Sequence, residues 1–210
     1  MSSTALITHS MMQAAQWLSQ GHLLAYPTES VWGIGCDPFN QRAVAQLLLL
    51  KQRPIDKGMI VVTDSAARLL PLLEPLNVNQ RQRILDSWTI APNAQHKQAH
   101  TWLLPLPESL SVPIPTWITG VHHSVAVRVI AHPLIQQLCA QMLSADNPYG
   151  FIVSTSCNPS NQPPAVSLMQ AQSYFKNHQY AEHIGYLQGE TLGYQLPSQI
   201  HDALSGQVIR

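Results

Sequence analysis

Two kinds of apolar pattern alternate along this chain, and each predicts one kind of secondary structure. In the first, apolar residues recur every three or four positions, as on the buried face of a helix. In the second, short apolar runs lie between proline, glycine or polar residues, as in buried strands. We expect helices over residues 11–20, 41–50, 79–88, 133–142 and 167–175, with one more beginning at Asp64. We expect strands over residues 23–26, 59–62, 101–104, 125–130 and 151–153, and near residues 184, 200 and 208.

This alternation of helices and strands is typical of a mixed α/β architecture. The 210 residues are enough to bury a sizeable core, and no internal repeat divides them. We therefore expect a single domain over residues 1–210. The pattern weakens between Pro92 and His123, where proline, histidine and polar residues accumulate. We expect this region to contain the most mobile loop.

The charge of the chain excludes some classes of partner. Its formal net charge is zero and only 10% of its residues are charged. Such a chain has no global attraction to nucleic acid, although a local basic patch could still make a weak contact with a tRNA. No apolar run approaches the roughly 18 residues of a membrane span, and residues 1–7 lack the basic start of a signal peptide. We expect a cytoplasmic protein with no membrane contact.

Cysteine and histidine give little sign of a metal or disulfide framework. Cys36, Cys139 and Cys157 are widely spaced and include no C-x-x-C pair, so reduced thiols are expected. His96 and His100 have the spacing of two ligands on one helical turn. Their segment lacks a neighbouring carboxylate and a persuasive helical pattern, so we expect no metal site there.

A polar turn follows the first buried strand, where Pro27 ends the ladder because it has no N–H. Thr28, Glu29 and Ser30 are then placed at a strand end, which is where α/β proteins usually bind ligands. Gly33 and Gly35 would let the backbone approach such a ligand closely. Taken alone, this stretch is equally typical of a polar turn whose glycines relieve crowding.

Three cations follow the next expected helix. Asn40 is a suitable N-cap for that helix, and Lys51, Arg53 and Lys57 come at and after its end. Cations in a last helical turn ordinarily complement the helix dipole, which is one interpretation. In a chain with so few charges their concentration also indicates an anion site, and phosphate is the natural ligand.

Two later strands carry further polar candidates. Ser154 and Ser156 flank a threonine just past a buried strand, where hydroxyl groups either cap the local backbone or donate to a phosphate or ribose. Arg128 interrupts the alternation of valines in its strand, so its side chain lies on the face opposite to theirs. A guanidinium among apolar neighbours usually has an anionic partner. That partner is either a structural carboxylate or a substrate carboxylate.

Taken together, the motifs resemble one family. Y-P-T-E-x-V-x-G-x-G followed by L-K-Q-R-P-x-D-K-G is similar to the opening of the YrdC/TsaC family of threonylcarbamoyl-AMP synthases. S-V-A-V-R-V with H-P, then V-S-T-S-C-N, P-S-Q-I and D-A-L-S-G are similar to later blocks of that family, in the same order. The resemblance covers nearly the whole chain and implies a single YrdC-like domain, with a twisted mixed β-sheet flanked by helices.

The resemblance also implies an activity. It is the condensation of L-threonine, bicarbonate and ATP into threonylcarbamoyl-adenylate with release of pyrophosphate, a nucleotidyltransferase reaction that serves tRNA modification. The implied partners are tRNA-modification proteins that transfer the threonylcarbamoyl group to a tRNA adenosine. Mg²⁺ is expected with the ATP, bound largely through the nucleotide because the sequence shows no carboxylate cage.

Roles for individual residues follow from matching positions. Threonine contacts are implied for Thr28, Arg128 and Ser198, with Arg128 binding the threonine carboxylate. ATP contacts are implied for Lys51, Arg53, Ser124, Ser154, Ser156, Asn158 and Arg210. Because Arg210 is the last residue, a frayed end is the alternative there. No side chain is expected to act as a covalent catalyst.

The chain departs from the family pattern at two places. After Trp88, a compact Pro-Gly-Pro is replaced by a longer stretch without glycine, which leaves the local geometry and any role of Thr101 open. The usual Ser-Ala-Asn-x-Ser-Gly becomes Ser156-Cys157-Asn158 followed by Ser160-Asn161. Asparagine also adopts left-handed turns, so neither small substitution predicts a loss of activity.

Two other classes of function are compatible with the residues. One is a non-catalytic RNA-binding or assembly module on the same fold, which the absence of net charge disfavours. The other is a hydrolase that uses Cys157 or a serine with a histidine as base, but no nucleophile-elbow motif surrounds these residues.

Overall fold

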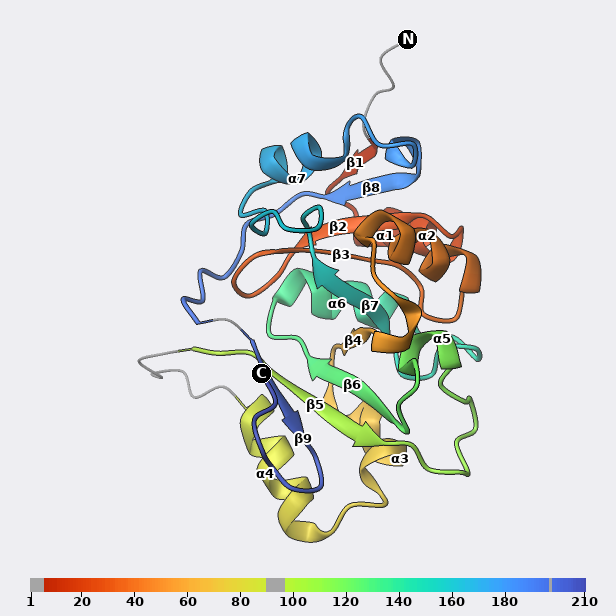
Figure 1. Cartoon of the computed structure of the whole chain (residues 1–210), viewed down its shortest axis with the longest axis vertical. Coiled ribbons are helices and arrows are strands. Elements are labelled where there is room, and N and C mark those ends of the chain that lie inside the picture. Colours follow the sequence, from red (N-terminus) through yellow and green to blue (C-terminus); the bar gives the residue numbers. More distant parts are fainter. Residues whose placement is uncertain (1–5, 90–96, 197) are drawn as a thin grey trace.

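The computed structural model describes residues 6–89, 97–196 and 198–210. These residues form one nine-stranded mixed sheet with the strand order β1-β8-β2-β3-β7-β4-β6-β5-β9. Figure 1 shows the sheet running from β1 and β8 at one end of the molecule to β5 and β9 at the other. The strands are β1 (Leu6–Thr8), β2 (Leu23–Pro27), β3 (Trp32–Gly35), β4 (Ile60–Thr63), β5 (His100–Pro105), β6 (Ser124–Val129), β7 (Ile152–Ser156), β8 (Ile184–Leu187) and β9 (Gln199–Asp202).

Helices cover both faces of the sheet, as in other α/β folds. One core cluster joins α1 and α6 to apolar residues of β2, β4, β7 and β8. The larger cluster contains α2 and most of the other helices. The α-helices are α1 (Met11–Ser19), α2 (Gln41–Lys51), α3 (Leu70–Leu73), α4 (Val78–Trp88), α5 (Thr116–Thr119), α6 (Pro133–Gln141) and α7 (Leu168–Phe175). Three 3₁₀ turns complete the set: η1 (Ile55–Lys57), η2 (Ala66–Leu69) and η3 (Ala181–His183).

The longer predicted helices are confirmed, together with their caps. The side chain of Ser10 accepts a hydrogen bond from Gln13 N, and that of Asn40 accepts one from Ala43 N. The five apolar residues of α2 whose spacing predicts a buried face are all buried, namely Ala43, Val44, Leu47, Leu48 and Leu50. The other two, Ala45 and Leu49, are exposed. Helix α2 ends where Gln52 adopts a left-handed conformation with φ 48°. That turn directs the chain from Lys51 into the segment that carries Arg53.

Two local predictions were wrong, and three elements were not predicted. The unpredicted elements are β1, α5 and β3, which residues 32–35 form directly after the predicted polar turn. The helix expected from Asp64 is a 3₁₀ turn followed by the single turn of α3. The strand expected near Val208 is only an isolated bridge to His201. The mobile loop expected between Pro92 and His123 stays a prediction, because residues 90–96 lie outside the described residues. The predicted strand β5 and the unpredicted helix α5 occupy other parts of that region.

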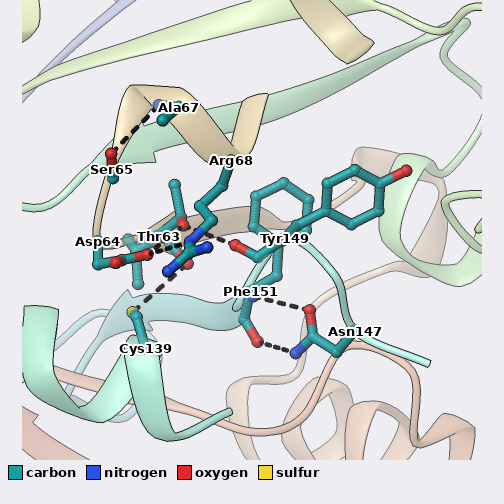
Figure 2. Close-up of polar contacts among 10 residues, drawn as sticks. Thr63, Asp64, Ser65, Ala67, Arg68, Cys139, Asn147, Tyr149 and Phe151 are labelled. Atoms are coloured by element: carbon teal, nitrogen blue, oxygen red, sulfur yellow. Dashed lines mark hydrogen bonds and ion pairs between the residues drawn. The ribbon is translucent and has the colours of Figure 1, made fainter. Parts of the chain in front are cut away.

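Strand β7 joins the two halves of the sheet, because it pairs antiparallel with β3 on one side and with β4 on the other. Figure 2 shows how its start is fixed: Asn147 Nδ2 donates to Phe151 O and Phe151 N donates to Asn147 Oδ1, both at 2.9 Å. Thr63 Oγ1 at the end of β4 donates to Tyr149 O at 2.7 Å. These buried bonds set the register of β7 and therefore the positions of the hydroxyl groups at its far end.

Gly35 allows β3 to approach β7 more closely than any other residue would. A Cβ atom on Gly35 would lie 1.6 Å from the carbonyl oxygen of Val153 and 3.1 Å from the hydroxyl of Tyr26. That hydroxyl donates to the same Val153 oxygen at 3.1 Å. The glycine therefore preserves both the strand pairing and a buried hydrogen bond.

We expect Gly35→Ala to lower the free energy of unfolding by about 3 kcal/mol or more, because overpacking and a lost buried hydrogen bond act together. Urea titration followed by circular dichroism measures the change. Gly193→Ala is the matched control, since nothing lies within 4 Å of its added Cβ although its φ is +71°. Its expected cost is about 1 kcal/mol from the left-handed backbone alone. Equal costs for the two variants would contradict the steric argument.

Candidate ligand-binding cavity

A cavity of about 570 Å³ opens beside β3, β6 and β7. Its volume lies within the range of small-molecule sites. All ten residues for which the sequence predicts ligand contacts line this cavity, although they come from segments far apart in the chain. They are Thr28, Lys51, Arg53, Ser124, Arg128, Ser154, Ser156, Asn158, Ser198 and Arg210. The structure therefore brings the predicted site residues together. Which ligand atom each residue contacts stays a prediction.

Lys51, the last residue of α2, extends to the end of β7 and to the loop after it. Its Nζ donates to Ser156 O at 2.7 Å, to Asn158 Oδ1 at 3.0 Å and to the carbonyl oxygen of Asn158. Burial lowers the pKa of the ammonium to about 8, and the nearby Arg53 acts in the same direction. Lys51 is thus a partly dehydrated cation held at the cavity wall by oxygen atoms, none of which belongs to a carboxylate.

Two guanidinium groups lie near each other in the same cavity. Arg53 Nε and Nη2 donate to the carbonyl oxygen of Gly58 at 3.1 and 2.8 Å, which fixes the turn after α2. Burial, and then the charge of Arg210, lower the pKa of the Arg53 guanidinium. Arg210 is held in place because its carbonyl oxygen accepts from Ile200 N at 2.8 Å, so the end of the chain is paired with β9. Two neighbouring like charges are the arrangement that an anion stabilises.

Arg128 has a structural carboxylate partner, one of the two alternatives left by its sequence position. Its Nη1 lies 3.4 Å from Glu29 Oε2, and its Nε donates to Thr101 Oγ1 at 3.3 Å. The Arg128 side chain is 12% exposed and that of Glu29 is 2% exposed. The ion pair is therefore largely withdrawn from water, while the guanidinium still lines the cavity.

The polar turn after β2 forms another part of the wall. Thr28 Oγ1 donates to Val31 O at 2.7 Å and the Thr28 amide donates to the same oxygen, so the turn is internally bonded. A Cβ on Gly33 would approach Thr28 Cγ2, the Tyr26 ring and Ser154 Oγ to between 3.0 and 3.3 Å. The glycine thus lets β3 lie close to the hydroxyl groups around it.

The loop after β7 is bonded through Asn158. Asn158 Nδ2 donates to Pro159 O at 3.1 Å and to Gln162 O at 2.6 Å, while its Oδ1 accepts from Lys51. Asn161 adopts a left-handed conformation with φ 65°, as predicted for the position where the family pattern has glycine. Asparagine at this position is therefore compatible with a left-handed turn in the loop.

Several cavity residues were not predicted as part of the site. Trp32 contributes from the unpredicted strand β3, and Thr119 and His122 contribute from α5 and the loop after it. Helix α5 is attached to the segment between η1 and β4, since Met59 N donates to Ile118 O at 2.7 Å. Pro115, which directly precedes α5, was the one local signal for this helix.

The charges around the cavity favour an anionic ligand with several charges. Lys51, Arg53, Lys57, Arg128 and Arg210 line it, whereas no carboxylate side chain does so within the described part of the chain. Of these five cations, Arg128 alone has a carboxylate partner among the described residues. The cavity thus contains one arginine, Arg128, whose charge is partly neutralised by a carboxylate. The other four cations have no carboxylate partner among the described residues.

Metal and thiol chemistry find little support in the described residues. Residues 6–89, 97–196 and 198–210 contain no group of three or more His, Cys, Asp or Glu that could hold a metal ion. His100 lies on a strand and not on a helix, and His96 lies outside the described residues. All three cysteines are buried and free, and burial raises the pKa of Cys157 to about 12. A protonated, buried thiol is a poor nucleophile, which weighs against the hydrolase alternative.

The mixed sheet with helices on both faces and a cavity lined by cations beside its strands defines the class of this chain, a small α/β protein with a basic cavity. Solved structures share this fold. P. abyssi Sua5 complexed with L-threonine superposes with a TM-score of 0.73 at 24% identity, over 95% of this chain and 54% of that one. E. coli YciO superposes with a TM-score of 0.71 at 16% identity, over 100% of this chain and 95% of that one.

Sequence comparison narrows the class to one family. A family model for Sua5, YciO and YrdC, described as "Telomere recombination", matches residues 16–210. Threonylcarbamoyl-AMP synthase of Psychrobacter arcticus is 68% identical over 211 residues, covering 99% of each chain. The synthase of Acinetobacter baylyi is 47% identical over 205 residues, covering 98% of each. The chain belongs to the Sua5/YciO/YrdC family.

The pKa of Lys51 gives a pH dependence that can be measured. A group with a pKa of about 8 loses its charge as the pH rises above that value. We therefore expect the affinity for a non-hydrolysable ATP analogue to fall about tenfold between about pH 7 and about pH 9.

Isothermal titration calorimetry measures this affinity, and Lys51→Arg is the matched control because arginine stays charged across the range. The expected result is that the arginine variant loses the pH dependence. If both proteins respond identically to pH, Lys51 is not the titrating group.

Proposed function

We propose that this protein is a threonylcarbamoyl-AMP synthase that condenses L-threonine, bicarbonate and ATP into threonylcarbamoyl-adenylate, pyrophosphate and water. The observation that carries the proposal is the distribution of cations around a single cavity, which offers an arginine for a carboxylate and a group of cations for a triphosphate. The names of the full-length relatives support it.

The chemistry needs positioning more than it needs a nucleophilic side chain. The amino group of threonine combines with bicarbonate to give a carbamate and water, and a carbamate oxygen then attacks the α-phosphate of ATP. The bond from the α-phosphorus to the oxygen bridging it to the β-phosphate breaks, and pyrophosphate leaves. An enzyme assists by aligning the reactants, stabilising the phosphate charge and excluding water.

Two groups of cavity residues divide these tasks. Arg128 binds the threonine carboxylate with Thr28 and Ser198 beside it, and the choice of amino acid depends on that trio. Lys51, Arg53 and Arg210 bind the phosphates, and Ser124, Ser154, Ser156 and Asn158 line the nucleotide path. The preorganised cations act where charge develops on the leaving pyrophosphate.

The described residues do not fit a protein-held magnesium ion, because no carboxylate side chain among them lines the cavity. We propose that Mg²⁺ is bound by the nucleotide phosphates and water, as is usual for this ion. When bound, it neutralises phosphate charge.

The product is a mixed anhydride that water hydrolyses, so a consuming step must follow closely. We propose that tRNA-modification proteins receive it and transfer the threonylcarbamoyl group to tRNA, and that this happens in the cytoplasm, where ATP and tRNA are found. No helix in the described part of the chain is long and apolar enough to cross a membrane.

Pyrophosphate release tests the proposal directly. We expect release from ATP and Mg²⁺ to require both threonine and bicarbonate, and to fall about a hundredfold or more in Arg128→Ala, since a bidentate charged contact is lost. Omitting each co-substrate in turn provides the controls. If folded protein leaves ATP intact under every condition, the non-catalytic RNA-binding or assembly function becomes the better proposal, and salt-dependent tRNA binding would support it.

Lys51→Ala should lower turnover about a hundredfold or more, because the phosphates lose a partly dehydrated cation. Circular dichroism and the melting temperature establish that the variant is folded. Lys176→Ala is the control, since that lysine is exposed after α7 and does not line the cavity. Wild-type turnover in well-folded Lys51→Ala would remove the assigned role.

A further inference from the structure

Glu29 is the most deeply buried carboxylate near the cavity. It does not line the cavity itself but pairs with Arg128, which does. The residue is 1% exposed. Its Oε1 accepts from Ala131 N at 2.9 Å, and its Oε2 lies 3.4 Å from Arg128 Nη1. Both carboxylate oxygens are thus directed to partners from β6 and the segment that follows it.

Thr101 supports the same guanidinium from another strand. It is 0% exposed on β5 and its hydroxyl accepts from Arg128 Nε at 3.3 Å. The antiparallel register that pairs Trp102 with Val127 places Thr101 opposite Arg128, one position further along. Arg128 therefore has two fixed contacts, one at Nε and one at Nη1, which restrain the plane of the guanidinium.

The backbone at Glu29 also holds the segment that leads to Ser198. Glu29 O accepts from Tyr194 N at 2.9 Å, and Thr28 O accepts from Leu192 N at 3.2 Å. The side chain and backbone of Glu29 thus connect the turn that carries Thr28, the strand that carries Arg128, and the segment before Ser198. These are the three residues proposed to bind threonine.

We propose that Glu29 and Thr101 are positioning residues that hold Arg128 in the orientation that binds the threonine carboxylate. The inference rests on the proposed function, because it assumes that threonine is the ligand of Arg128. A planar guanidinium binds a carboxylate through two parallel hydrogen bonds only when its orientation is fixed. Glu29 additionally offsets part of the charge of Arg128, which suits a singly charged carboxylate in place of a phosphate.

Substitutions at Glu29 and Thr101 separate this role from simple stability. Glu29→Gln keeps the size of the side chain and an oxygen for Ala131 N, but places an amide beside Arg128. Thr101→Val removes only the hydroxyl, and Thr101→Ser restores it. Asp64→Asn is the matched control, because it breaks the other ion pair in the described part of the chain, with Arg68, away from the cavity.

Threonine affinity is measured by isothermal titration calorimetry on the full chain with a saturating non-hydrolysable ATP analogue. We expect Glu29→Gln and Thr101→Val to weaken threonine binding roughly tenfold or more, as for the loss of a hydrogen bond to a charged group. The affinity for the analogue should change less than twofold. Thr101→Ser and Asp64→Asn should bind threonine like the wild type.

A kinetic cycle adds a measurement that a purely structural role would not affect. If Glu29 acts through Arg128, Glu29→Gln should lower kcat/KM for threonine in the wild type but not further in Arg128→Ala. Equal fold losses in both backgrounds would overturn the inference, as would wild-type threonine affinity in Glu29→Gln and Thr101→Val. A parallel loss of analogue affinity would do the same by indicating general disruption. A wild-type protein that binds no threonine would instead contradict the proposed function.

Discussion

The close antiparallel contact of β3 with β7 is the constraint on which the rest of this structure depends. Within the described sheet, β7 is the one strand that pairs with both halves, the first formed by β1, β8, β2 and β3 and the second by β4, β6, β5 and β9. The contact exists because Gly35 leaves room for the Val153 carbonyl. Residues of both halves line the cavity, so its shape is set by how the halves meet at this strand.

Lys51 strengthens the same junction from one face. Helix α2 packs on the core beside β3, and its last residue donates to the loop after β7. The lysine therefore stabilises the arrangement of the sheet and also supplies charge to the cavity. Glu29 likewise connects two parts of the structure, because it lies in the turn after β2 and bonds to β6 and the residues that follow it.

The sequence predicted the features that depend on neighbouring residues and missed those that depend on strand order. Helix α2, its Asn40 cap and the cations at its end follow from local spacing, and the ten predicted site residues were found in one cavity because family motifs identified them. Strand β3 was missed because two glycines in four residues indicate a turn unless a neighbouring strand requires the space. The contact of Thr101 with Arg128 requires β5 to pair with β6, and no local pattern specifies that pairing.

The oxygen atoms around Lys51 have a consequence for how tightly any anion is held. An arriving phosphate does not meet a free ammonium group, because the ammonium already donates to the backbone and side-chain oxygens of the β7 loop. Binding is therefore an exchange of one set of acceptors for another, and the net affinity reflects only the difference between them. An anion that displaced these acceptors would weaken the attachment of the loop to α2, and ligand occupancy would then be thermodynamically linked to the order of the loop.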